Sequence, residues 1–120
     1  MFANVLVGLV AAIHVYILVL EMFLWTKPYG RRVFGSTAEF AEASKTLAAN
    51  QGLYNGFLAA GLIWGLMLGP AGRAVQLFFL GCVIVAGVFG AATVNRRILF
   101  VQAAPAALAF IAVLAAGSSA

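Results

Sequence analysis

Charged side chains are scarce in this chain of 120 residues. Only 8 % of the residues are Asp, Glu, Lys or Arg, against about 25 % in an average soluble domain. Apolar residues make up 65 %, so a soluble fold of this size would lack the polar groups that normally cover a surface. The composition excludes a soluble enzyme, a secreted disulfide scaffold and a disordered tail, and it predicts an integral membrane protein.

Cysteine is scarce as well, since Cys82 is the only one. A single cysteine excludes an intrachain disulfide, and a thiolate metal site would need further ligands. With one histidine and three acids we expect no metal, and the absence of phosphate-loop, dinucleotide and redox motifs predicts no cofactor. The net charge of +4 arises from basic residues between apolar runs, which is typical of membrane-protein loops and not of a nucleic-acid partner.

Apolar stretches recur along the chain, each close to the 17–25 residues that a helix needs to cross a bilayer. They cover residues 2–25, 47–68, 75–94 and 99–116. Short turns join neighbours, and short turns favour antiparallel packing. We therefore predict an all-α, up-down-up-down four-helix bundle in the membrane, formed by a single transmembrane domain over residues 1–120.

The breaks between these stretches contain helix-ending residues. Lys27-Pro28-Tyr29-Gly30 is expected to end the first helix, Gly69–Gly72 to form a tight turn, and Asn95–Arg97 to form the third turn. Ser36 with Glu39 reads as a capping box that predicts a helix starting near Thr37.

This short helix either runs straight into the second span or bends near Ser44. We expect it to lie at the cytoplasmic interface of the membrane. Phe34 and Phe40 would dip into the lipid there, and Arg31 and Arg32 would lie near anionic headgroups.

Basic residues also predict the orientation. The first and third loops hold six of them, and the opposite side holds only Arg73. The six are Lys27, Arg31, Arg32, Lys45, Arg96 and Arg97. Because positive loops stay in the cytoplasm, we expect a multi-pass protein of the bacterial inner membrane with both termini outside.

Ionisable groups are costly inside a bilayer, which makes their placement informative. His14 and Glu21 lie seven residues apart on the first span, so they differ by only about 20° around a helix. Trp25 would fall on the same face one turn further along. We expect this face to point into the bundle and not into lipid.

The second span carries a polar cluster made of Asn50, Gln51, Tyr54 and Asn55. On a helix these side chains form one arc and not a ring, and Gln102 opens the fourth span just before Pro105. We predict a polar pocket open toward the cytoplasm, with His14 at its floor. The expected ligand-binding residues are Glu21, Trp25, Asn50, Gln51, Tyr54, Asn55 and Gln102.

Small residues form two rows on the same span. Gly61, Gly65 and Gly69 continue the polar stripe, and such spacing lets another helix approach closely. A second row, Gly52-Gly56-Ala60, lies on the other side of the helix. It serves either a neighbour within the bundle or a second copy of the chain in a homo-oligomer.

Three segments carry a family resemblance: His14–Ile17 (HVYI), Leu20–Trp25 (LEMFLW) and Asn50–Gly61 (NQGLYNGFLAAG). They closely resemble a family of small bacterial integral membrane proteins known as domain of unknown function 1304, over essentially the whole chain. The resemblance implies a four-span membrane protein of about this size. It implies no reaction, substrate or cofactor.

Three functions remain open from the sequence. The first is binding or transport of a small membrane-soluble molecule among the membrane lipids, linked to a proton on Glu21. The second is an intramembrane isomerase or hydratase, with His14, Glu21 and Tyr54 as candidate acid and base groups. The third is an accessory subunit of a larger complex. A structural role for Glu21 would instead pair it with Arg96 or Arg97.

Overall fold

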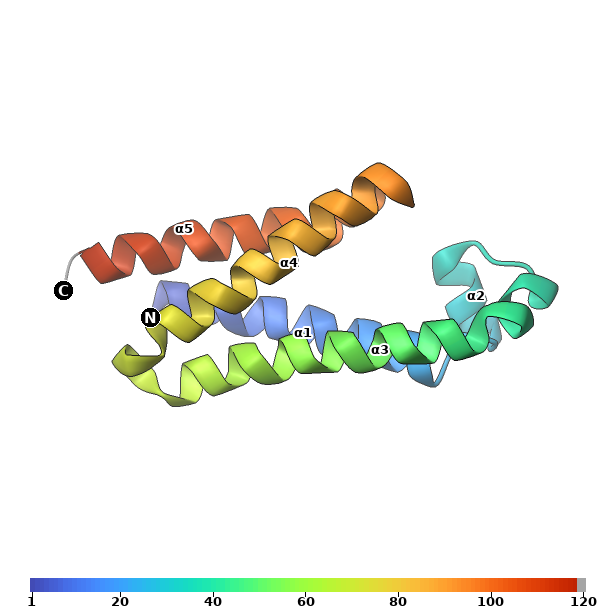
Figure 1. Cartoon of the computed structure of the whole chain (residues 1–120), viewed down its shortest axis with the longest axis horizontal. Coiled ribbons are helices and arrows are strands. Elements are labelled where there is room, and N and C mark those ends of the chain that lie inside the picture. Colours follow the sequence, from blue (N-terminus) through green and yellow to red (C-terminus); the bar gives the residue numbers. More distant parts are fainter. Residues whose placement is uncertain (119–120) are drawn as a thin grey trace. The chain divides into compact units, whose positions relative to one another are not determined.

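The computed structural model describes residues 1–118, where helices joined by short turns make up the regular structure and no strand occurs. The helices are α1 (Phe2–Met22), α2 (Pro28–Phe34), α3 (Ala38–Met67), α4 (Arg73–Thr93) and α5 (Ala104–Ser118). A 3₁₀ turn, η1 (Gly69–Gly72), and a π turn, η2 (Leu99–Ala103), complete the order shown in Figure 1. The all-α prediction is confirmed.

The chain divides into two compact units, which are described separately. The core unit comprises Met1–Ile13 and Leu58–Ala120, and the elbow unit comprises His14–Phe57. Each of the long helices α1 and α3 contributes one part to each unit.

The core unit is built around small and branched apolar side chains. Its centre includes Val7, Val10, Leu62, Leu80 and Val83, all at most 1 % exposed. Without water to drive apolar association in a bilayer, helices gain most from close van der Waals contact. This arrangement, in which apolar positions of four helix segments meet, gives the core unit that contact.

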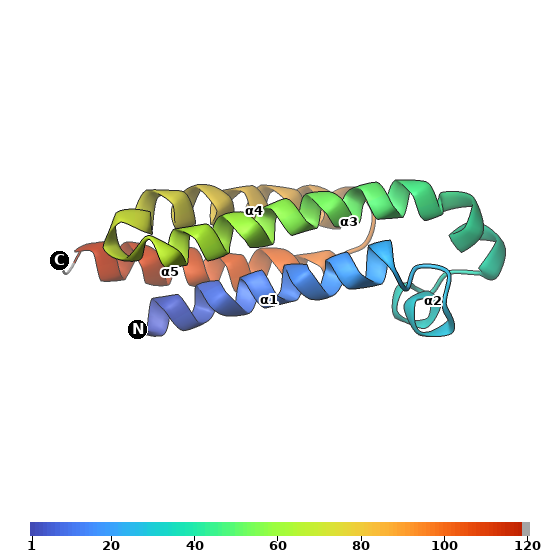
Figure 2. The same cartoon turned by 90° about the horizontal axis from the view of Figure 1, so that it is seen from below.

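Glycines set the closest approaches within the core unit. A Cβ atom added at Gly87 would lie 2.8 Å from the backbone nitrogen of Ala103, so α4 meets the π turn η2 almost backbone to backbone. Gly61 packs against the ring of Phe79, and Gln76 Nε2 donates to the carbonyl of Gly65 at 3.1 Å. The predicted close approach of a neighbouring helix is confirmed at Gly61 and Gly65, whereas Gly69 lies in the turn η1, where an added Cβ atom would meet nothing within 4 Å. Figures 1 and 2 both show α4 and α5 side by side.

The turns of the core unit follow the expected chemistry. Gly69, the first residue of η1, has φ +63°, a left-handed conformation that favours glycine, and Pro70 follows it in the first turn. In the third turn Asn95 Oδ1 accepts a hydrogen bond from the Arg97 N–H at 2.9 Å. The π turn η2 precedes Pro105, which has no N–H to continue a regular α-helical ladder.

The elbow unit differs from the predicted boundaries. α1 ends at Met22 and not at Trp25, and Pro28 begins the extra helix α2 instead of only ending the first span. Gly30 explains the sharp return of the chain, because its backbone packs directly on the Leu24 carbonyl, where any side chain would overlap. Figure 2 shows α2 between the end of α1 and the start of α3.

The cap of α3 lies one residue later than predicted. Thr37 Oγ1, not Ser36, accepts a hydrogen bond from the Phe40 N–H at 3.1 Å, and the helix begins at Ala38. Gly35, at φ +67°, ends α2, and the Ser36 N–H still donates to the Arg31 carbonyl at 2.9 Å, so Ser36 belongs to the end of α2 and Thr37 caps α3. From Ala38 the helix runs without interruption to Met67. The helix therefore continues straight into the predicted second span and has no break near Ser44, which was the first of the two predicted alternatives.

Three helical segments are long and apolar enough to cross a membrane: Phe2–Met22, Gly69–Thr93 and Leu99–Gly117. They correspond to the predicted spans 2–25, 75–94 and 99–116. The predicted span 47–68 lies inside α3. Its amides, Asn50, Gln51 and Asn55, lower the hydropathy of that segment, so α3 does not belong to this set.

Candidate functional site

The centre of the elbow unit is a carboxylate bonded to an amide. Asn55 Nδ2 on α3 donates to Glu21 Oε1 on α1 at 2.6 Å, and Asn55 is 8 % exposed. The same amide nitrogen donates to the carbonyl of Gln51 at 3.2 Å. Because an amide nitrogen has only two hydrogens, Asn55 has none left to donate to a ligand and instead positions Glu21.

Glycines of α3 bring the two helices together at this point. A Cβ atom at Gly52 would lie 2.5 Å from Met22 Cγ, 3.2 Å from Glu21 Cβ and 3.3 Å from the Leu18 carbonyl oxygen. One at Gly56 would lie 2.8 Å from Leu18 Cδ1. The Gly52–Gly56 row therefore faces α1 within the chain, which is the first of the two roles predicted for it.

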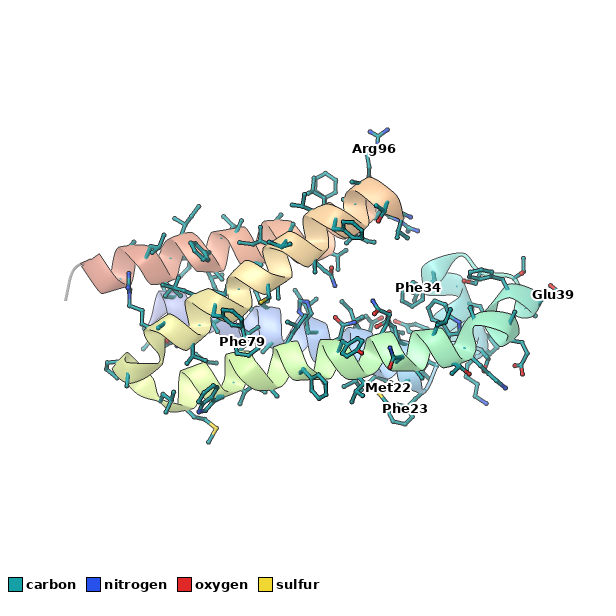
Figure 3. All side chains as sticks on the ribbon, viewed as in Figure 1. Met22, Phe23, Phe34, Glu39, Phe79 and Arg96 are labelled. Atoms are coloured by element: carbon teal, nitrogen blue, oxygen red, sulfur yellow. The ribbon has the colours of Figure 1, made fainter. Side chains whose placement is uncertain are left out.

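An open hollow of about 330 Å³ lies beside this pair. It is bounded by the end of α1, the following turn and one stretch of α3. Its lining comprises Glu21, Met22, Phe23, Trp25, Thr26, Lys45, Thr46 and Ala49. Figure 3 shows Met22 and Phe23 where α1 ends beside α3. The hollow thus combines one carboxylate, one ammonium, two hydroxyls and an apolar wall.

The charges around the hollow are not equivalent. Lys45 Nζ forms an ion pair with Glu42 at 2.5 Å, and both side chains are more than half exposed. It is the one ion pair found among residues 1–118. Within the elbow unit Glu21 is bonded to a neutral amide and not to a cation, and its pairing with Arg96 or Arg97, which belong to the core unit, stays an untested alternative.

Trp25 lines the hollow from the turn after α1, and not from the α1 helix as predicted. It lies beyond the end of α1, so it does not continue the helical face of His14 and Glu21. Its Nε1–H donates to Ser44 Oγ at 3.0 Å, and its ring lies 4.8 Å from that of Phe34, centroid to centroid. These contacts fix the indole between α2 and α3.

A hydrogen bond also links α2 to the second half of α1. The hydroxyls of Tyr16 and Tyr29 lie 2.5 Å apart. Because Tyr16 is nearly two turns before the end of α1, α2 folds back beside the last turns of that helix. α2 carries Arg31 and Arg32 in its last turn, and their placement near anionic headgroups stays a prediction.

The other predicted site residues are more dispersed. His14 is 1 % exposed, as expected for an inward-facing position. Asn50, Gln51 and Tyr54 lie on the exposed side of α3, and Tyr54 contacts Phe57. Gln102 is half-buried in η2, within the core unit. The structure therefore brings together Glu21, Asn55 and Trp25, and the ligand-binding roles of the others remain predictions.

Some lining residues were not predicted from the sequence. The sequence gives no sign that Lys45, Thr26 and Thr46 lie near Glu21. Their spacing is that of ordinary loop or helix-end residues. The close approach at Gly52 was the available signal, since it places the turn after α1 beside residues 45–49 of α3. Across the described part of the chain, no group of three or more His, Cys, Asp or Glu side chains is placed to hold a metal ion.

Comparison with known proteins agrees with the resemblance noted in the sequence. A family model described as "Protein of unknown function (DUF1304)" matches residues 8–114. The chain is also 35 % identical over 105 residues to "Uncharacterized protein YpaA" of Lactococcus lactis subsp. lactis (strain IL1403), covering 86 % of this chain and 88 % of that protein. No solved structure matches.

Proposed function

The chain belongs to this family of proteins of unknown function, and we propose that it is a bacterial membrane protein that binds or transports a small membrane-soluble molecule at the hollow beside Glu21, with a proton exchanged on that carboxylate. The observation that carries the proposal is the neutral partner of Glu21. An arginine in place of Asn55 would favour one charge state of the carboxylate, whereas an amide donor can bond to it in either state.

The shape of the site supports binding over a purely structural role. A carboxylate that served only to fix two helices would be enclosed by its partners, whereas Glu21 is partly accessible and lines a hollow of about 330 Å³. Aromatic and thioether groups on the same wall suit a ligand with an apolar part. An enzyme would need a second titratable group free to act on the ligand, and Lys45 in this lining is paired with Glu42.

The proposal includes a membrane topology. We place four spans in the bilayer, formed by α1, the second half of α3, α4 and α5, arranged up and down with both termini outside. The six basic residues of the first and third loops would then lie in the cytoplasm, opposite Arg73. The hollow would open near the cytoplasmic surface.

Substituted-cysteine labelling tests this topology. With Cys82 replaced by alanine, a membrane-impermeant maleimide should label Ala71→Cys on intact cells, because Ala71 lies in the exposed turn η1. It should label Ser36→Cys only after the membrane is permeabilised. Labelling of Ser36→Cys on intact cells would overturn the orientation.

A fluorescence titration tests the role of Glu21. The chain has two tryptophans, so Trp64→Phe leaves Trp25, which shares the hollow with Glu21, as the reporter. The emission of Trp25 should change with pH, and this change should disappear in Glu21→Gln but persist in Glu39→Gln, a matched change at an exposed acid. An unchanged titration in Glu21→Gln, together with a large loss of thermal stability, would assign Glu21 a structural role instead.

A further inference from the structure

We propose, building on the function proposed above, that the hollow beside Glu21 takes an amphiphilic amine, with the ammonium group on the Glu21 carboxylate and the apolar chain along Met22 and Phe23. Lys45 forms an exposed ion pair with Glu42 at 2.5 Å, and Glu21 is bonded to the neutral Asn55 amide. Of the two charged side chains in the lining, Lys45 thus has a carboxylate partner outside the hollow, whereas Glu21 has no ion-pair partner within the elbow unit.

The end of α1 adds acceptors at the same place. The helix stops at Met22, and the carbonyl of Val19 accepts from both the Phe23 and Leu24 N–H groups, at 3.0 and 3.2 Å. The Val19 carbonyl is therefore satisfied, and it is the carbonyls after it, which have no i+4 donor within the helix, that carry the partial negative charge of the helix end. An ammonium group supplies three donors and a positive charge, which matches this end of the helix and the Glu21 carboxylate together.

The apolar wall of the hollow suits the rest of such a ligand. Phe23 is 64 % exposed and Met22 is 37 % exposed, and both border the hollow at the end of α1 (Figure 3). The indole of Trp25, fixed by Ser44 and Phe34, offers an aromatic surface that attracts a cation. A fatty acid would meet like charge at Glu21, and an alcohol would leave the carboxylate without a counter-charge.

The same geometry links the amine to a proton. Glu21 has one carboxylate to offer, so a proton and an ammonium group compete for it. Where Glu21 is protonated, binding of the ammonium group displaces the proton into solution. The net charge of the site is zero before and after this exchange. Amine affinity should therefore weaken as the pH falls.

Binding of three matched probes tests the ligand class. Decylamine, decan-1-ol and decanoate are titrated into Trp64→Phe protein in lipid nanodiscs while the emission of Trp25 is followed. We expect saturable binding of decylamine only, weakened about tenfold or more in Glu21→Gln, since hydrogen bonds to a charged group contribute strongly, and unchanged in Glu39→Gln. Subtraction of the Glu21→Gln signal removes simple partition of the probes into lipid.

Proton release provides a second measurement that needs no variant. In weakly buffered solution, below the midpoint of the Trp25 titration so that Glu21 is protonated, the wild-type protein should release protons when decylamine is added as its hydrochloride at the same pH, and not when decan-1-ol is added. Saturable, Glu21-dependent binding of decan-1-ol or decanoate in place of decylamine would refute the amine and leave the proposed function standing. If the wild-type protein releases no proton and the emission of Trp25 shows no Glu21-dependent change with pH, both the amine and the proposed function are refuted.

Discussion

Replacement of Gly52 by alanine should weaken the packing of α1 on α3. The new methyl group would lie 2.5 Å from Met22 Cγ, and it would also be tight against Glu21 Cβ and the Leu18 carbonyl, at 3.2 and 3.3 Å. The first contact can relax through the Met22 side chain, but the other two atoms are held by the α1 backbone. Overpacking of this kind costs about 1–3 kcal/mol, offset by the roughly 1 kcal/mol by which alanine exceeds glycine in helix propensity.

A matched control separates these two effects. Gly81 lies in the middle of α4, and a Cβ atom there would meet no atom of a neighbouring side chain or helix within 4 Å. Gly81→Ala should therefore keep the propensity gain of roughly 1 kcal/mol without the clash. The two variants should differ by about 1–3 kcal/mol in free energy of unfolding, measured by SDS-induced unfolding of detergent-solubilised protein and followed by circular dichroism. If Gly52→Ala gained as much stability as Gly81→Ala, α1 and α3 would not approach as closely as described.

Two further substitutions test other parts of the structure. Thr37→Ala should lower the free energy of unfolding by about 1 kcal/mol through loss of the α3 cap, with faster hydrogen exchange in the first turn of α3. The neighbouring Ser36→Ala is the control, and a larger effect there would restore the capping box predicted from the sequence. Gln76→Met keeps the side-chain length but removes the donor to the Gly65 carbonyl, and it should cost about 1–3 kcal/mol in the same unfolding assay. A neutral result would show that this buried carbonyl is satisfied without Gln76.

The helices of this protein could be predicted largely from apolar runs and turn residues. Segments with polar residues only near their ends, such as 75–94, agree with the structure to within two residues at each end. The end of α1 was misplaced because Phe23, Leu24 and Trp25 are apolar enough to continue a span. Only the packing of Gly30 on the Leu24 carbonyl shows why the chain turns earlier, and that contact has no signal in hydropathy.

The site was harder to predict because α3 offers two candidate inward faces. Periodicity separates the stripe of Asn50 and Tyr54 from the stripe of Gly52 and Gly56, but it does not say which one meets α1. Polarity favours the first stripe as the lining of a pocket, yet in the elbow unit the glycine stripe is the one that faces α1. Asn55 lies at the border of both stripes and is the polar residue that reaches Glu21.

The three acids of the chain show why Glu21 differs from the others. Glu42 pairs with Lys45 on the surface, and Glu39 is exposed in the first turn of α3, where the helix dipole favours a negative charge. Glu21 alone lies at the end of a span, bonded to an amide whose two hydrogens are both in use. Asn55 can therefore orient the carboxylate without neutralising it. Within the elbow unit Glu21 has no ion-pair partner, and we propose that a proton or a ligand supplies its counter-charge. The close approach at Gly52 and Gly56 brings α1 and α3 together where Asn55 bonds to Glu21, and it therefore supports the exchange proposed for the site.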